Sequence, residues 1–166
     1  MIQQSARVGR VVAGAIVALA LASVYGPSEV AAQGAKKSDS VVKVNVTADK
    51  PGTDGKQVVT VTLTMDKGWH TYANPVGNKD LNEVQTTVTI SGKNKPEAKI
   101  EYPMGVLVKD DVVGDYKVYE DKVTIKATVQ RAKGDTDPLE VAVKFQACTD
   151  KQCLLPATVK VNVDPK

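Results

Sequence analysis

VVTVTLTM, residues 58–65, alternates apolar and polar side chains and indicates the fold of the whole chain. The odd-numbered positions from Val59 to Met65 are all apolar, whereas the even-numbered positions are Val58 and three threonines. Alternation with a period of two is typical of a half-buried strand, and β-branched side chains pack well on a pleated surface. The stretch therefore predicts a strand with one face in a core and the other in water.

The same alternation recurs along the chain. It is found at 42–46, weakly at 86–90, and again at 123–130, 139–147 and 157–163. Segments rich in Gly, Pro and Asp separate these runs at 49–56, 91–97 and 132–138, and no segment of the exported part has a convincing helical period. Six or more short strands joined by such turns predict an all-β fold, namely an immunoglobulin-like antiparallel β-sandwich.

Composition excludes several classes of protein. The chain has 166 residues, of which 42% are hydrophobic and 25% charged, as in ordinary folded domains. Its net charge of +3 is too small to indicate binding to nucleic acid or to a membrane surface. No Gly-rich phosphate loop and no nucleophile or metalloprotease motif is present, so no motif of this kind predicts a cofactor or a metal.

The first residues read as an export signal. Arg7 and Arg10 precede an uncharged run over residues 11–26, and small residues lead to a predicted cleavage site after Ala32. An uncleaved membrane anchor is the alternative, although the apolar run is shorter than the roughly 20 residues of a membrane span. We therefore predict a signal peptide over residues 1–32, a flexible linker over 33–40 and one domain over 41–166, located in the periplasm or secreted.

Cys148 and Cys153 are the only cysteines, and four residues separate them. They bracket a tight connection between two predicted strands, where the two sulfur atoms come within bonding reach. A disulfide there closes a short loop and contributes only about 2 kcal/mol, against about 4 kcal/mol for a loop of several tens of residues. Three interpretations remain open: a local structural disulfide, a thiol–disulfide exchange pair, or part of a metal site with His70 and a methionine, Met65 or Met104.

Two segments interrupt the alternation. GWHTYANPVGN (68–78) and YPMGVLVKDDVVGDYKVYED (102–121) concentrate Gly, Pro and aromatic residues. Irregular segments carried on a rigid scaffold are where binding and catalytic residues tend to lie. These two segments are therefore candidates for the surroundings of a functional site.

Three stretches resemble a known family. They are DKGWHTYANP (66–75), YPMGVLVKDDVVGDYKVYEDKVTI (102–125) and VKFQACTDKQCLLPATVKV (143–161). Together they resemble the N-terminal periplasmic domain of the thiol:disulfide interchange protein DsbD. The resemblance implies an immunoglobulin-like domain that exchanges electrons through a cysteine pair, as an interchange component acting on partner proteins.

The resemblance also implies roles for individual residues. The redox pair is Cys148 and Cys153. A cap loop that shields the pair comprises Asp110, Asp111, Val112, Val113, Gly114 and Tyr116. The active-site neighbours are Trp69, His70, Tyr72, Phe145, Gln146 and Pro156.

Partners follow from the same resemblance. The electron donor is expected to be a thioredoxin-like or membrane-embedded protein, and the acceptor a periplasmic disulfide oxidoreductase or isomerase. The domain itself meets the membrane only through a partner. Of the two sulfur atoms, we expect that of Cys148 to face the partner.

The chain departs from the best-known members of the family in two features. It has four rather than five residues between the cysteines, and Val112 stands where an aromatic residue usually tips the cap. The alternative function is a non-enzymatic immunoglobulin-like binding or assembly module, in which the disulfide only pins a hairpin.

Overall fold

The computed structural model describes residues 35–164, and the regular secondary structure of this part of the chain consists of strands and two short 3-10 helices. The strands and two short 3-10 helices follow in the order η1 (Ser38–Ser40), β1 (Val42–Ala48), β2 (Lys56–Met65), β3 (His70–Tyr72), η2 (Lys79–Val84), β4 (Thr87–Ser91), β5 (Glu97–Glu101), β6 (Val106–Val108), β7 (Tyr116–Glu120), β8 (Lys122–Gln130), β9 (Leu139–Phe145), β10 (Ala147–Cys148) and β11 (Ala157–Val163). Between residues 35 and 164, no helix has the length and apolar character that a membrane span requires. The predicted signal peptide, 1–32, lies outside the described residues.

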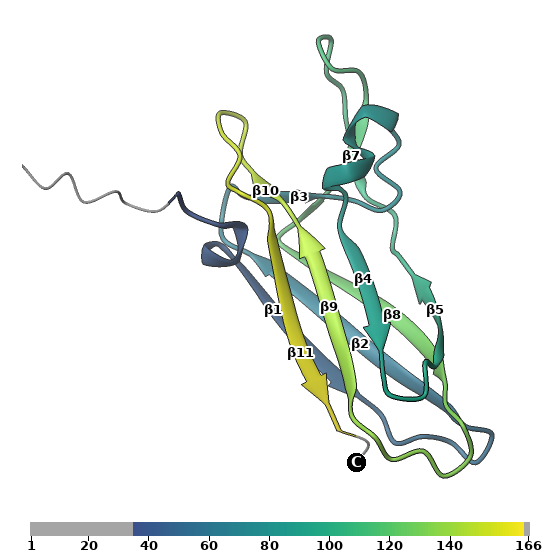
Figure 1. The fold of residues 1–166 in the computed structure, drawn as a ribbon. Helices are drawn as coiled ribbons and strands as arrows, with labels where there is room; N and C mark the ends of the chain where they lie inside the picture. Colours follow the sequence, from purple (N-terminus) through teal and green to yellow (C-terminus); the bar gives the residue numbers. More distant parts are fainter. Residues whose placement is uncertain (1–34, 165–166) are drawn as a thin grey trace, which may run out of the picture. The chain divides into compact units, whose positions relative to one another are not determined.

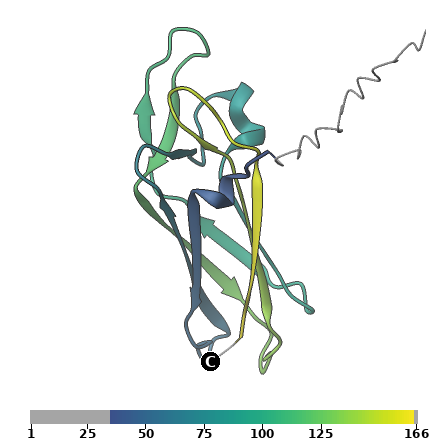
Figure 2. The same ribbon diagram turned by 90° about the vertical axis from the view of Figure 1, so that its left-hand side faces the viewer.

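Two sheets form the sandwich and a third lies at one of its ends. The sandwich sheets have the strand orders β1-β2-β8-β5 and β11-β9-β4, and the third sheet has the order β10-β3-β7-β6. All paired strands are antiparallel. Figures 1 and 2 show the third sheet above the long strands of the sandwich. The predicted all-β antiparallel sandwich is confirmed.

The core follows the alternation of the sequence. Val59, Val61 and Leu63 of β2 are fully buried, whereas the threonines between them are partly exposed. In the sheet β1-β2-β8-β5, Val61 lies opposite Val46 of β1 and Ile125 of β8. Full burial of such a side chain stabilises the fold by roughly 1.5–3 kcal/mol. The core is therefore built mainly from the branched side chains of the alternating strands.

The segment predicted as a flexible linker contributes to the folded domain. Ser38–Ser40 form the 3-10 helix η1, and Ser38 is completely buried. Lys37 also forms an isolated parallel bridge with Leu155, far along the chain. The polar composition of 33–40 suggested a linker, but long-range hydrogen bonds hold its second half in place.

The chain changes sheets just before the first cysteine. Strand β9 pairs with β11 up to Phe145, which lies opposite Ala157. After one unpaired residue, β10 pairs with β3 of the third sheet, so that Cys148 lies opposite His70. This change of sheet carries the cysteines away from the sandwich to the end of the domain.

Candidate functional site

The cysteine hairpin, residues 147–155, carries a disulfide bond. Cys148 and Cys153 are bonded, and their Cα atoms are 4.0 Å apart. The two residues also form an antiparallel bridge, and Thr149 N–H donates to Gln152 C=O at 2.8 Å inside the turn. The Thr149 hydroxyl accepts from the backbone N–H groups of Lys151 and Gln152, at 3.2 Å each. The predicted bonding of the pair across a tight connection is therefore present.

The two cysteines differ in exposure. Cys148 is only 2% exposed, because β10 lies inside the end of the domain. Cys153 follows the turn and is exposed. The expectation that Cys148 faces the partner is therefore wrong for this structure, because the change of sheet buries the first cysteine and leaves the second one open to attack.

Tyr72 lies beside the buried sulfur. Its hydroxyl and Cys148 Sγ are 3.7 Å apart, within the range of a sulfur hydrogen bond. Burial, followed by the neighbouring Tyr116, raises the pKa of Tyr72 above its ordinary value, so the hydroxyl keeps its proton at neutral pH. The two tyrosine rings meet at a centroid distance of 5.7 Å. Tyr72 can therefore donate a hydrogen bond to a thiolate at Cys148.

His70 lies between the cysteine hairpin and acidic side chains. It pairs with Cys148 on one side and with Glu120 on the other. Burial lowers the pKa of His70, and the carboxylates of Asp150 and Glu120 oppose that shift. A cleft of about 240 Å³ opens here, and it is lined by Gly68, Trp69, His70, Glu120, Asp121 and Asp150.

The cap hairpin, residues 106–120, consists of β6, β7 and the turn between them. Asp110 Oδ1 accepts from the backbone N–H groups of Val112 at 2.8 Å and Val113 at 3.0 Å, and these bonds lower the pKa of Asp110. Gly114 has a φ of 84°, a conformation that glycine adopts without strain. The loop predicted as a cap is thus an ordered turn.

The tip of the cap hairpin projects into solvent. Val112 is 93% exposed, and Asn78 Nδ2 donates to Val113 C=O at 2.7 Å. Figures 1 and 2 show the cap hairpin and the cysteine hairpin at the same end of the domain. Since Cys153 is exposed as well, the tip does not cover it in this structure. Shielding of the pair by this loop stays a prediction.

The remaining predicted neighbours lie at different depths. Phe145 is buried in the core, and Trp69 packs partly buried against the same cluster. Gln146 Nε2 donates to Leu154 C=O at 3.0 Å and so joins the two arms of the cysteine hairpin. Pro156 is exposed at the start of β11.

Comparisons with known proteins identify the family. The model of the family described as "Thiol:disulfide interchange protein DsbD, N-terminal" matches residues 37–165, which is most of the chain. The chain belongs to this family. Among curated proteins, no sequence matches the chain.

Solved structures share the fold of this DsbD N-terminal family member. The N-terminal periplasmic domain of ScsB from Proteus mirabilis has a TM-score of 0.59 and 19% identity, over 75% of this chain and 47% of that one. The reduced DsbD N-terminal domain from Neisseria meningitidis has a TM-score of 0.50 and 15% identity, over 76% of this chain and 86% of that one. The chain therefore spans about half the length of the first structure, and these likenesses concern the fold.

Sequence reasoning missed three contributors to the site of this DsbD-type domain. Ser38 bonds both arms of the cysteine hairpin, Asn78 holds the cap hairpin, and Glu120 flanks His70. The first two make their contacts across more than 30 residues, and no local pattern in the sequence encodes such contacts. Glu120 was within reach, because it lies in 102–121, one of the two irregular segments that were candidates for the surroundings of a site.

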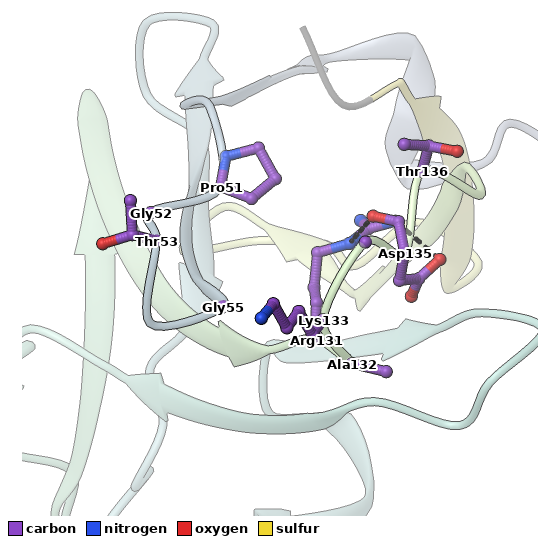
Figure 3. A pocket seen from close by; sticks show the side chains of 10 residues that line it. Pro51, Gly52, Thr53, Gly55, Arg131, Ala132, Lys133, Asp135 and Thr136 are labelled. Carbon is purple, nitrogen blue, oxygen red and sulfur yellow. Dashed lines mark hydrogen bonds and ion pairs between the residues drawn. The ribbon is translucent and has the colours of Figure 1, made fainter.

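Two further observations concern cation-binding side chains and a hollow that lies apart from the cysteines. Within residues 35–164, no three His, Cys, Asp or Glu side chains come together as a cation site. A hollow of about 680 Å³ lies between the turns 51–55 and 131–136, away from the cysteines, and Figure 3 shows the residues that line it. Neither cysteine lines this hollow.

Proposed function

We propose that this domain relays electrons between partner proteins by thiol–disulfide exchange through Cys148 and Cys153. The observation that carries the proposal is the unequal exposure of a bonded cysteine pair in a chain of the DsbD N-terminal family. Exchange requires one sulfur that a partner can reach and a second one that completes the reaction. Cys153 meets the first requirement, and Cys148, directly bonded to it, meets the second.

Electron delivery takes two steps. In the dithiol form, the Cys153 thiolate attacks a sulfur of the partner's disulfide, which forms a mixed disulfide and expels the partner's other sulfur as a thiolate. The Cys148 thiolate then attacks Cys153 Sγ. This step forms the internal disulfide and releases the partner as a dithiol, two electrons richer.

Electron uptake runs the same steps in reverse. A thiolate of a reduced donor attacks Cys153 Sγ, and Cys148 leaves as a thiolate in a nearly dry environment. The Tyr72 hydroxyl, 3.7 Å from Cys148 Sγ, stabilises this leaving group by donating a hydrogen bond. The protonated state of Tyr72 at neutral pH supports this role.

The partners that fit are proteins with their own reactive cysteine pairs. We propose a thioredoxin-like or membrane-embedded donor and a periplasmic disulfide oxidoreductase or isomerase acceptor, with the domain itself in the periplasm. The exposed valines at the tip of the cap hairpin, Val112 and Val113, supply an apolar contact at the same end of the domain as Cys153. Docking there leaves the sulfur bond accessible to the partner's thiolate.

The direct test mixes the oxidised domain with an excess of a reduced thioredoxin-like protein and counts free thiols by alkylation and mass measurement. We expect two alkylated cysteines per domain. If the bond survives the excess reductant, the exchange function is contradicted, and a structural disulfide in a binding module explains the hairpin instead.

A further inference from the structure

A buried serine far from the cysteines in sequence connects the two arms of the cysteine hairpin. Ser38 is 0% exposed, and its hydroxyl donates to Leu155 C=O at 2.8 Å. The same oxygen accepts from Ala147 N–H at 2.8 Å. The Ser38 backbone N–H donates to Leu155 C=O as well, at 2.9 Å. The hydroxyl therefore uses both its donor and one acceptor site on the hairpin.

The two hydrogen-bond partners of the Ser38 hydroxyl lie on either side of the cysteine pair. Ala147 immediately precedes Cys148, and Leu155 follows Cys153 by two residues. One hydroxyl group thus bridges the two chain segments that carry the sulfur atoms. The arms are also joined directly, because Leu154 N–H donates to Ala147 C=O at 2.9 Å and Gln146 Nε2 donates to Leu154 C=O at 3.0 Å. The bridge does not depend on the sulfur–sulfur bond, so it can persist when that bond is broken.

We propose that Ser38 is a positioning residue that sets the reduction potential of the Cys148–Cys153 pair. The inference rests on the proposed function, because only a pair that cycles needs a tuned potential. Reduction breaks the sulfur–sulfur bond and adds two electrons and two protons; in a glutathione buffer, two glutathione thiols lose them and become glutathione disulfide. By holding both arms close in the dithiol form, Ser38 raises the effective concentration of one thiol at the other and so favours the disulfide.

The test is the equilibrium of the pair in glutathione buffers of graded composition. Replacing Ser38→Ala frees the arms and leaves Ala147 N–H without its buried acceptor. We expect the equilibrium constant for disulfide formation to fall about tenfold, which raises the reduction potential by about 30 mV for a two-electron couple. Alkylation of free thiols followed by mass measurement gives the oxidised fraction at each buffer composition.

Two variants serve as controls. Ser40→Ala removes a hydroxyl from the same 3-10 helix; Ser40 is exposed and donates only to Lys37 C=O, at 2.7 Å. It should leave the potential unchanged. Ser38→Thr keeps the hydroxyl and should restore a potential close to that of the unmodified protein. A potential of Ser38→Ala equal to that of Ser40→Ala overturns the proposal.

A measurement on the unmodified protein covers the case in which Ser38→Ala does not fold. The Ala147 amide should stay protected from hydrogen exchange in both the oxidised and the reduced domain, because its acceptor is the Ser38 hydroxyl. Rapid exchange of this amide in the reduced domain would show that the bridge opens with the disulfide, which contradicts the proposal. Failure of the unmodified domain to react with a thioredoxin-like protein would contradict the proposed function alone, because glutathione still reports the potential.

Discussion

Arg131 at one end of the sandwich and Cys153 at the other are held in opposite ways. The guanidinium of Arg131 is buried with 3% exposure, and it donates to Gln57 Oε1 at 2.9 Å, to Asp135 C=O at 3.2 Å and to Asp137 C=O. Figure 3 shows the side chain of Arg131 pointing towards Asp135. Cys153, in contrast, is exposed on a turn, at the same end of the domain as the exposed valines of the cap hairpin.

The two ends of the sandwich therefore serve different properties: one contributes to stability and the other carries the reactive groups. At the turn end, defined by residues 49–56 and 131–138, buried polar groups find all their partners inside the protein, as a closed scaffold requires. At the cysteine end, defined by the cysteine hairpin and the cap hairpin, apolar and reactive groups remain open to a partner. Changes at the two ends should therefore affect different measurements.

The largest effect on stability should come from Arg131→Met. The variant leaves the carbonyl oxygen of the buried Gln57 side chain without a hydrogen-bond donor. Losing the partner of a buried polar group lowers the free energy of unfolding by roughly 2–3 kcal/mol. Urea unfolding followed by the fluorescence of Trp69 measures it. The neighbouring exposed Lys133→Met is the matched control and should change little. Exchange with a thioredoxin-like protein should keep its rate; a large change in rate would mean that the two ends are not independent.

Tyr72→Phe should act at the cysteine end and mainly on rate. Without the hydroxyl, the Cys148 thiolate loses a hydrogen-bond donor as it leaves, and we expect reduction by dithiothreitol to slow by about tenfold. Stopped samples analysed by alkylation give the rate. Tyr119→Phe is the control, because the Tyr119 hydroxyl bonds Asn74 and Pro103 rather than sulfur. Equal rates for both variants would remove Tyr72 from the mechanism.

A smaller effect is expected at the tip of the cap hairpin. Val112→Ser reduces the apolar surface that a protein partner would cover, and exchange with a thioredoxin-like protein should slow by about threefold. Glutathione is too small to need this contact, so its reaction with the same variant is the internal control. Equal slowing with both reagents would show that Val112 affects the chemistry and not the docking.

The smallest effect concerns pH and His70. Because burial lowers the pKa of His70, the unfolded chain binds a proton more readily than the folded domain as the pH falls through about 6.5. The contribution of the neutral histidine to stability is therefore present above that pH and is lost as the pH drops towards the folded pKa. His70→Gln should flatten the loss of stability measured between pH 7 and 5.5. An unchanged slope would contradict this assignment, since the chain has no other histidine.

The sequence predicted the sandwich because the patterns that encode strands and turns are local in the chain. The alternation in β2 and β8 states which side chains are buried, and the Gly, Pro and Asp turns state where the strands end. The hairpin between β9 and β11 follows from two adjacent alternating runs. The resemblance to a family supplied the cysteine pair and its aromatic neighbours, including Tyr72.

The parts that the sequence did not predict depend on contacts between distant segments. The change of sheet after Phe145 decides which cysteine is buried. It depends on the pairing of Cys148 with His70, which lies more than 70 residues earlier in the chain. Ser38 lies in a segment of polar composition, yet it is completely buried because the cysteine hairpin supplies its hydrogen-bond partners. Polar residues whose burial depends on a remote partner have no periodic signature.

Trapping of a partner on a single cysteine tests the central claim most directly. With Cys148→Ala, the exposed Cys153 should displace thionitrobenzoate from a thioredoxin-like protein that keeps a single, thionitrobenzoate-modified cysteine, and the resulting mixed disulfide should persist because neither protein then has a resolving sulfur. With Cys153→Ala, the buried Cys148 should trap little or nothing. Non-reducing electrophoresis and mass measurement of the adducts give both results. A stable adduct on Cys148 together with none on Cys153 would contradict the account.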